Sequence, residues 1–236
     1  SDWSSDVCSS DLWLTSLISY FAPWIVREPR SAALAWNAYD MFDLLRFLPE
    51  IETGVVNVNL QALRLPLVGL AVLLPPLLAK FSLLVRMIGV GVSLGLAALT
   101  LPPYPQIVTA WRTPGWRVPF WWAVGAMACA VISVRIAPRH ERARRWWIIS
   151  VVQIATLPAI VTLQRLLPPL QRLHTASVRP GAGFWGCILA LGAVGLLTWA
   201  RSLAASAGED LMVPVSTVAD KTTASQTLEP DGEPIE

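Results

Sequence analysis

Long apolar runs separated by short polar segments dominate the chain. Crossing a hydrocarbon core of about 30 Å takes about 20 apolar residues in a helix. Runs that approach or reach this length occupy residues 13–26, 60–79, 81–101, 120–136, 146–163 and 184–203. The pattern therefore predicts an all-α fold, a polytopic transmembrane helix bundle with about six membrane-spanning helices.

The segment 31–48, between the first and second runs, has a different pattern. Its apolar residues recur at three- and four-residue spacing, which places them on one helix face: Leu34, Ala38, Met41, Phe42, Leu45 and Leu48. Asp40 and Asp43 lie around the other side, and we interpret them as solvated charges. The pattern predicts an amphipathic helix on the membrane surface. The alternative is a solvated helix that covers the bundle.

The two ends of the chain differ from this membrane domain of residues 13–203. Residues 1–12, SDWSSDVCSSDL, resemble the translation of a common sequencing adapter. We therefore expect that they are an artefact and that the natural start of the first helix is missing, so these residues carry no functional argument. Residues 204–236 are polar and acidic and lack helical periodicity, which predicts a disordered acidic C-terminal tail.

Composition and charge refine the location. The chain has 54% hydrophobic and 14% charged residues, against about 25% charged residues in a typical soluble domain. Abundant Ala, Pro, Trp and Arg indicate a GC-rich bacterial genome. The Arg-rich segment 135–145 favours a cytoplasmic position. We expect a multi-pass protein of the bacterial inner or plasma membrane, with a cytoplasmic C-terminus and the lipid bilayer as its surroundings.

Tryptophans gather near the predicted ends of the helices, as in interfacial aromatic belts. One predicted belt contains Trp24, Trp111, Trp116, Trp121, Trp122 and Trp185, and the other contains Trp13, Trp146, Trp147 and Trp199. With the neighbouring arginines, Trp146 and Trp147 can bind anionic lipid head groups. The alternative is that this basic segment only determines topology.

Motifs for chemistry are weak. Gly91 and Gly95 flank Ser93 in a G-x-S-x-G match, but the match lies inside an apolar run and lacks the strand–turn–helix context of a nucleophile. Their spacing instead predicts close helix packing at Gly91 and Gly95. The cysteines lack metal-binding spacing, and no phosphate-binding loop is present. We therefore predict no catalytic, metal or cofactor site and no nucleic-acid partner.

Ionisable residues bear on the choice of function. The interiors of the predicted spans contain no Asp, Glu or His, which ion-coupled transporters usually carry there. We expect a non-enzymatic scaffold or accessory subunit of a membrane complex, with a membrane protein partner or a second copy. An alternative is the membrane-embedded substrate-binding component of a small-molecule transporter energised by a separate subunit. A third is a membrane enzyme with a loop-based site that uses Asp40, Asp43 or His174.

Overall fold

The computed structural model describes residues 3–28, 35–45, 51, 58–102, 106–136, 141–174 and 177–211. Residues 1–199 form one compact unit, and residues 200–236, which include the end of the last helix, form a second. The α-helices among the described residues are α1 (Trp3–Phe21), α2 (Ala38–Leu45), α4 (Leu65–Leu77), α5 (Leu83–Ala98), α6 (Pro114–Ile136), α7 (Glu141–His174) and α8 (Ala182–Leu211).

Four helical segments among the described residues are long and apolar enough to cross a membrane. They are Leu60–Leu77, Pro114–Ser133, Glu141–Arg172 and Ala182–Ala204. The predicted span 81–101 contains α5, which is apolar but has only 16 residues, about 24 Å at 1.5 Å per residue. The mainly helical class and the presence of helices able to cross a membrane are confirmed, whereas the count of six is not.

The last residues of the first predicted span, 13–26, form a strand and not a helix. Helix α1 stops at Phe21, and Pro23–Glu28 form β1. Proline lacks the N–H that would continue the helix and restricts the residue before it. The following Trp24, Ile25 and Val26 are aromatic or β-branched, and such residues favour extended backbone.

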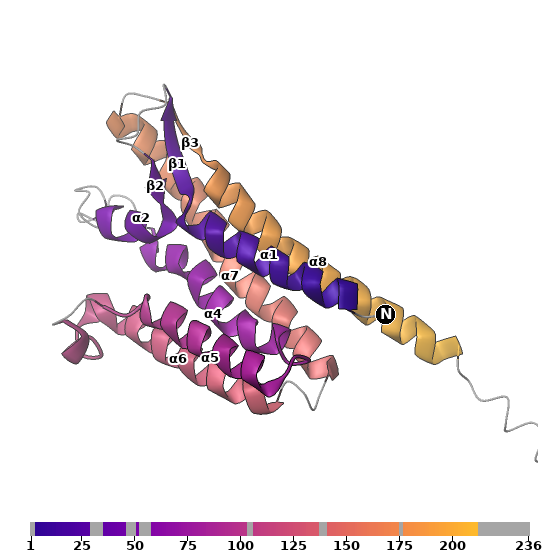
Figure 1. Cartoon of the computed structure of the whole chain (residues 1–236). Coiled ribbons are helices and arrows are strands. Elements are labelled where there is room, and N and C mark those ends of the chain that lie inside the picture. The colour runs from indigo at the N-terminus through magenta and orange to yellow at the C-terminus, as the bar shows by residue number, and fades with distance from the viewer. Residues whose placement is uncertain are drawn as a thin grey trace, which may run out of the picture. The chain divides into compact units, whose positions relative to one another are not determined.

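A small antiparallel sheet, which the all-α prediction did not include, joins distant parts of the chain. Strand β1 pairs with β2 (Trp36–Asn37) on one side and with β3 (Ser177–Pro180) on the other. In the longer ladder, Val26 lies opposite Arg179. The sheet therefore ties the segment after α1 to the α7–α8 connection (Figure 1).

Helix α4 forms the centre of the bundle. It packs against α1, α5, α6 and α7, and 78% of the span that contains it is buried inside the protein. Figure 1 shows α4 between the α5–α6 pair and α1. A Cβ added at Gly69 would lie 2.6 Å from the Cβ of Ala155, so glycine permits the close approach of α4 and α7.

Most of the tryptophans whose burial is described are either buried or exposed, and Trp36 and Trp122 are intermediate. Trp13, Trp24 and Trp116 are buried in the hydrophobic core. The exposed ones are Trp111, Trp121, Trp146, Trp147, Trp185 and Trp199. The exposed group suits an aromatic belt at a membrane surface, whereas the buried group contributes to helix packing.

The chain ends bear on two further predictions. Residues 3–12 form the first part of α1, and the adapter origin of residues 1–12 stays a prediction that genomic sequencing tests. At the other end, α8 continues to Leu211. The first part of the predicted disordered tail, residues 204–211, is therefore helical, and residues 212–236 lie outside the described residues.

Candidate functional site

A buried arginine marks the start of the central helix. Arg64 ends the 3-10 helix Leu60–Arg64 and directly precedes α4, and it is 3% exposed. The backbone reaches this position because the Asn59 Oδ1 accepts a hydrogen bond from the Gln61 N–H, which caps the 3-10 helix. Pro66 then lies in the first turn of α4, where the missing N–H costs nothing.

The Arg64 guanidinium joins three elements. Its Nη1 donates a hydrogen bond to the Thr100 carbonyl oxygen just after α5, at 3.2 Å. Its Nη2 lies 3.5 Å from the Asp43 Oδ1 on α2, and the Asp43 side chain is half exposed. The guanidinium carbon also lies 3.8 Å from the centre of the Phe42 ring, in a cation–π arrangement. Arg64 therefore holds α2 and the end of α5 to the start of α4.

Aromatic side chains surround this cluster. Phe42 also lies beside Trp116 of α6, with 6.3 Å between ring centres. The buried Tyr20 donates its hydroxyl hydrogen to the Leu63 carbonyl oxygen at 3.3 Å. A buried cation is costly unless charge and hydrogen-bond partners compensate it. The carboxylate, carbonyl and rings here supply that compensation, so the arrangement is suited to holding helices together.

The apolar face predicted for the segment 31–48 is turned into the protein where it is described. The observed helix is shorter than the prediction, Ala38–Leu45, and Met41, Phe42 and Leu45 on it are buried. Leu34 and Leu48 lie outside the described residues. These positions favour the alternative of a helix that covers the bundle.

The acidic residues of α2 have structural contacts. The Asn37 side chain donates to the Asp40 Oδ2 and accepts from the Asp40 N–H, both at 2.8 Å, which caps the start of α2. Asp43 contacts Arg64. His174, the third residue considered for a loop-based site, is the last residue of α7. The described contacts do not bring these three residues together.

The two glycines predicted to mediate helix packing face outward on α5. Gly91 and Gly95 are exposed, and a Cβ added at either would meet nothing within 4 Å. Close packing at these positions is therefore not made within the described part of the chain. Ser93, between them, is fully buried. The close approaches occur instead at other glycines, including Gly69, Gly89 and Gly186.

A cavity of about 250 Å³ lies beside the Arg64 cluster. Its walls come from Phe42 on α2, the 58–61 segment and the start of α6: Phe42, Val58, Asn59, Leu60, Gln61 and Gly115. The Gln61 Nε2 points to the Gly115 carbonyl oxygen at 3.5 Å, and the buried Gln61 Oε1 has no hydrogen-bond partner among the described residues. The cavity thus offers both polar and apolar contacts.

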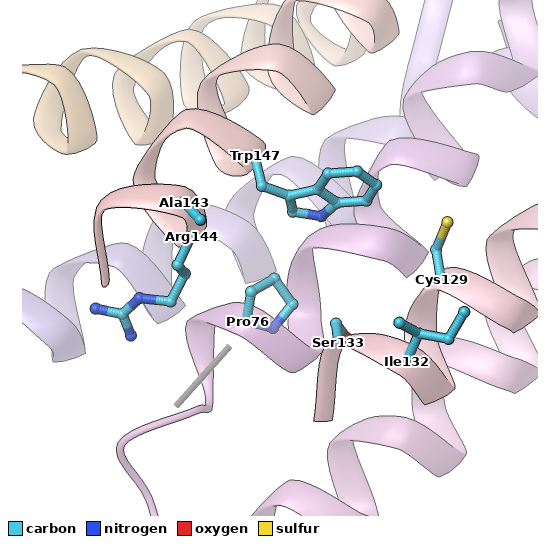
Figure 2. Close-up of a pocket in the computed structure, with 7 residues that line it drawn as sticks. All are labelled: Pro76, Cys129, Ile132, Ser133, Ala143, Arg144 and Trp147. Carbon is cyan, nitrogen blue, oxygen red and sulfur yellow. The ribbon is translucent and has the colours of Figure 1, made fainter. Parts of the chain in front are cut away.

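A second cavity, of about 290 Å³, lies among α4, α6 and α7. Figure 2 shows the residues that line it: Pro76, Cys129, Ile132, Ser133, Ala143, Arg144 and Trp147. Its wall is almost wholly apolar. The Ser133 hydroxyl donates to the Ala130 carbonyl oxygen of its own helix at 2.9 Å, so it is already satisfied.

Arg64 was not among the residues predicted from the sequence to form a site. The only local signal is a single cation among apolar residues in LQALRLPLVGL, residues 60–70. A cation at the start of a span usually reaches out to the head groups, and its burial depends on α2 and α5. No group of three metal-ligating side chains occurs in the described ranges. In the comparisons with known proteins, no family model, curated protein or solved structure matches the chain.

Proposed function

We propose that this chain is a non-enzymatic integral membrane protein, a scaffold or accessory subunit of a membrane complex in a bacterial inner or plasma membrane. One observation carries the proposal: most of the buried side-chain hydrogen bonds in the described part of the chain go to its own backbone carbonyl oxygens. Such bonds fix helices relative to one another and leave fewer groups free to bind a substrate. The proposal includes six spans and a cytoplasmic C-terminus.

Three of these bonds connect different helices to α1. The Trp13 Nε1–H donates to the Leu70 carbonyl oxygen of α4 at 2.9 Å. The Ser16 hydroxyl lies 3.1 Å from the Cys187 carbonyl oxygen of α8. Tyr20, one turn later, bonds to the segment before α4. Helix α1 is therefore attached by polar side chains along one face, which suits a rigid frame.

Other buried hydroxyls serve their own helices. Ser133, Thr156 and Thr198 donate to carbonyl oxygens three or four residues earlier. This local bonding satisfies a hydroxyl inside a membrane helix without requiring a ligand. The buried hydroxyls on α6, α7 and α8 are thus compatible with packing as their main role.

The outer surface suits contact with lipid or with a partner helix. Large apolar side chains are exposed on α5 and α6: Leu83, Leu84, Met87, Ile88, Val92, Val118, Trp121, Val124, Val131 and Ile132. In water this would be an unusually extensive apolar surface. At Gly91 and Gly95 no side chain projects from α5 and no other atom fills the space, so the backbone of another helix can approach α5 closely.

Site-specific photocrosslinking in native membranes tests the proposal. The crosslinking side chain is placed at Val92, which is exposed on α5 between the two glycines, and separately at Leu189, which is exposed on α8. We expect a protein adduct of discrete mass from Val92 and lipid adducts alone from Leu189. Lipid adducts alone from both positions would contradict a scaffold or subunit role for this surface.

The cavity beside Gln61 favours a second candidate, the substrate-binding component of a transporter powered by another subunit. A partly polar cavity with an unsatisfied buried amide oxygen is suited to a small solute with a hydrogen-bond donor. A solute panel measured by thermal shift in detergent tests it. A solute that stabilises the natural chain but not Gln61→Leu would support this function, and no shift from any donor-bearing solute would contradict it.

A further inference from the structure

We propose that the cavity among α4, α6 and α7 binds an anionic phospholipid, with part of one acyl chain inside and the phosphate at Arg144. The cavity measures about 290 Å³, close to the lower end of ligand pockets at about 300–1,000 Å³. Its wall is apolar. That volume and chemistry suit a segment of hydrocarbon chain and not a whole lipid molecule.

The cavity lies where apolar helices meet charged residues. Pro76 is the second-to-last residue of α4, and the exposed Lys80 follows in the turn to α5. Trp147 lines the cavity from the second turn of α7 and is 41% exposed, and the adjacent Trp146 is also exposed. Tryptophan favours the head-group level of a membrane. A chain in this cavity would thus continue directly to a head group at the surface.

The charge beside the cavity is positive. Glu141 is the only described carboxylate in the first turn of α7, and both Arg144 and Arg145 contact it. The positive charge of Lys80 also attracts the Glu141 carboxylate. Arg142 is exposed next to them. Four cations and one carboxylate leave an excess of positive charge, which complements an anionic head group.

Arg144 is the cation best placed for a phosphate. Its aliphatic part lines the cavity, and Figure 2 shows its guanidinium directed away from Cys129 and Ile132. Its Nη2 is 3.5 Å from the Glu141 Oε1, a long contact beside the 2.9 Å from the Arg145 Nη2. The Arg144 Nε is buried and has no hydrogen-bond partner among the described residues. A guanidinium with unused donors can bind a phosphate in a bidentate manner.

Native mass spectrometry of the full chain in detergent tests the lipid site. The probes are phosphatidylglycerol, which is anionic, and phosphatidylcholine with the same chains, which is zwitterionic. We expect preferential retention of one phosphatidylglycerol. Arg144→Gln removes a charged hydrogen bond, commonly about 1.5–3 kcal/mol, so it should weaken that retention about tenfold or more. The matched control Arg142→Gln removes the same charge from an exposed arginine that does not line the cavity, so it should weaken the retention much less than Arg144→Gln does.

A cavity-filling variant distinguishes a lipid from a free anion. Ala143 is exposed but lines the cavity, so Ala143→Phe can fill it with little disturbance of the core. We expect this variant to lose phosphatidylglycerol. If it retains the lipid, or if inorganic phosphate displaces the lipid as readily as added phosphatidylglycerol does, the cationic cluster binds an anion without a chain. Two results would overturn the proposal: equal retention of both lipids by the natural chain, or equal effects of Arg142→Gln and Arg144→Gln. The basic residues at the start of α7 would then serve only to determine topology.

Fluorescence quenching supplies a second measurement that does not depend on Ala143→Phe. Phosphatidylglycerol brominated on its acyl chains should quench Trp147 because that ring lines the cavity. The quenching component specific for phosphatidylglycerol over phosphatidylcholine should disappear in Trp147→Phe. It should persist in Trp146→Phe, which removes an exposed ring outside the cavity. Loss of the component in both variants or in neither would contradict occupation of this cavity.

Discussion

Phe42→Ala should release α2 from the bundle. Phe42 is 3% exposed, with its ring beneath the Arg64 guanidinium at 3.8 Å and beside Trp116 at 6.3 Å between ring centres. Replacing a buried phenylalanine by alanine costs about 3–5 kcal/mol. Because α2 has only eight residues, we expect most of this loss to appear as local opening. The equilibrium for opening should rise by about 10²- to 10⁴-fold.

Cysteine accessibility measures this opening. Met41 is fully buried on α2, so Met41→Cys in a background without Cys8 and Cys129 should react with a maleimide only when α2 leaves the bundle. In that background, Phe42→Ala should raise the maleimide reaction rate by about 10²- to 10⁴-fold. This holds while the reaction with the open state is slower than the return of α2 to the bundle. Labelling in denaturant gives the upper limit of the rate.

The control for this experiment changes the acidic side of α2. Asp40→Asn plus Asp43→Asn keeps the volume of both side chains and removes their charge. Only the Asp43 carboxylate of the pair is half exposed, and the buried Arg64 keeps its hydrogen bond to the Thr100 carbonyl oxygen. We therefore expect the double change to destabilise the docked α2 by about 1 kcal/mol or less and to change the rate by about tenfold or less. If the acidic pair opens α2 as much as Phe42→Ala does, the apolar contacts are not what holds it. The loop-based enzyme hypothesis with Asp40 and Asp43 would then gain support.

Three further predictions concern packing, the buried cation and topology. Gly69→Ala should lower thermal stability in detergent by about 1–3 kcal/mol through overpacking of α4 against α7, whereas Gly91→Ala, in open space, should leave it unchanged or raise it by up to about 1 kcal/mol. Arg64→Met should lower the free energy of unfolding by about 1–3 kcal/mol, because losing the charged hydrogen bond costs more than is gained by no longer burying a cation. A variant as stable as the natural chain in the same melt would refute this. Val108→Cys should react with a membrane-impermeant reagent in intact cells and Arg142→Cys should not, and the opposite pattern would reverse the proposed orientation.

The apolar runs were informative about which segments become helices and less informative about where helices begin and end. Helix α6 begins at Pro114, six residues before the predicted run, because proline suits the first helical turn even where Arg117 interrupts the apolar pattern. Helix α7 begins at Glu141 and ends at His174, well beyond the predicted run 146–163. Hydropathy detects the part of a helix that suits hydrocarbon, whereas backbone hydrogen bonding continues into polar residues.

Features that depend on long-range contact could not be predicted locally. The pairing of β1 with β3 joins segments about 150 residues apart, so neither strand alone indicates it. The burial of Arg64 requires α2 and the end of α5 to approach α4. Likewise, the small-residue spacing at Gly91 and Gly95 gives no information about which helix faces meet. Close contact occurs at Gly69, which the spacing argument did not single out.

The central position of β1 in the sheet has a consequence for biosynthesis. Residues 23–28 are synthesised about 150 residues before the main partner strand, residues 177–180. At about 5–20 residues per second, β1 waits roughly 8–30 s for that partner. During this interval its backbone N–H and C=O groups facing β3 are unpaired, and an open strand edge readily pairs with other chains. The α7–α8 connection thus completes the sheet that begins after α1. A factor that shields β1 during membrane insertion would raise the yield of correctly assembled protein.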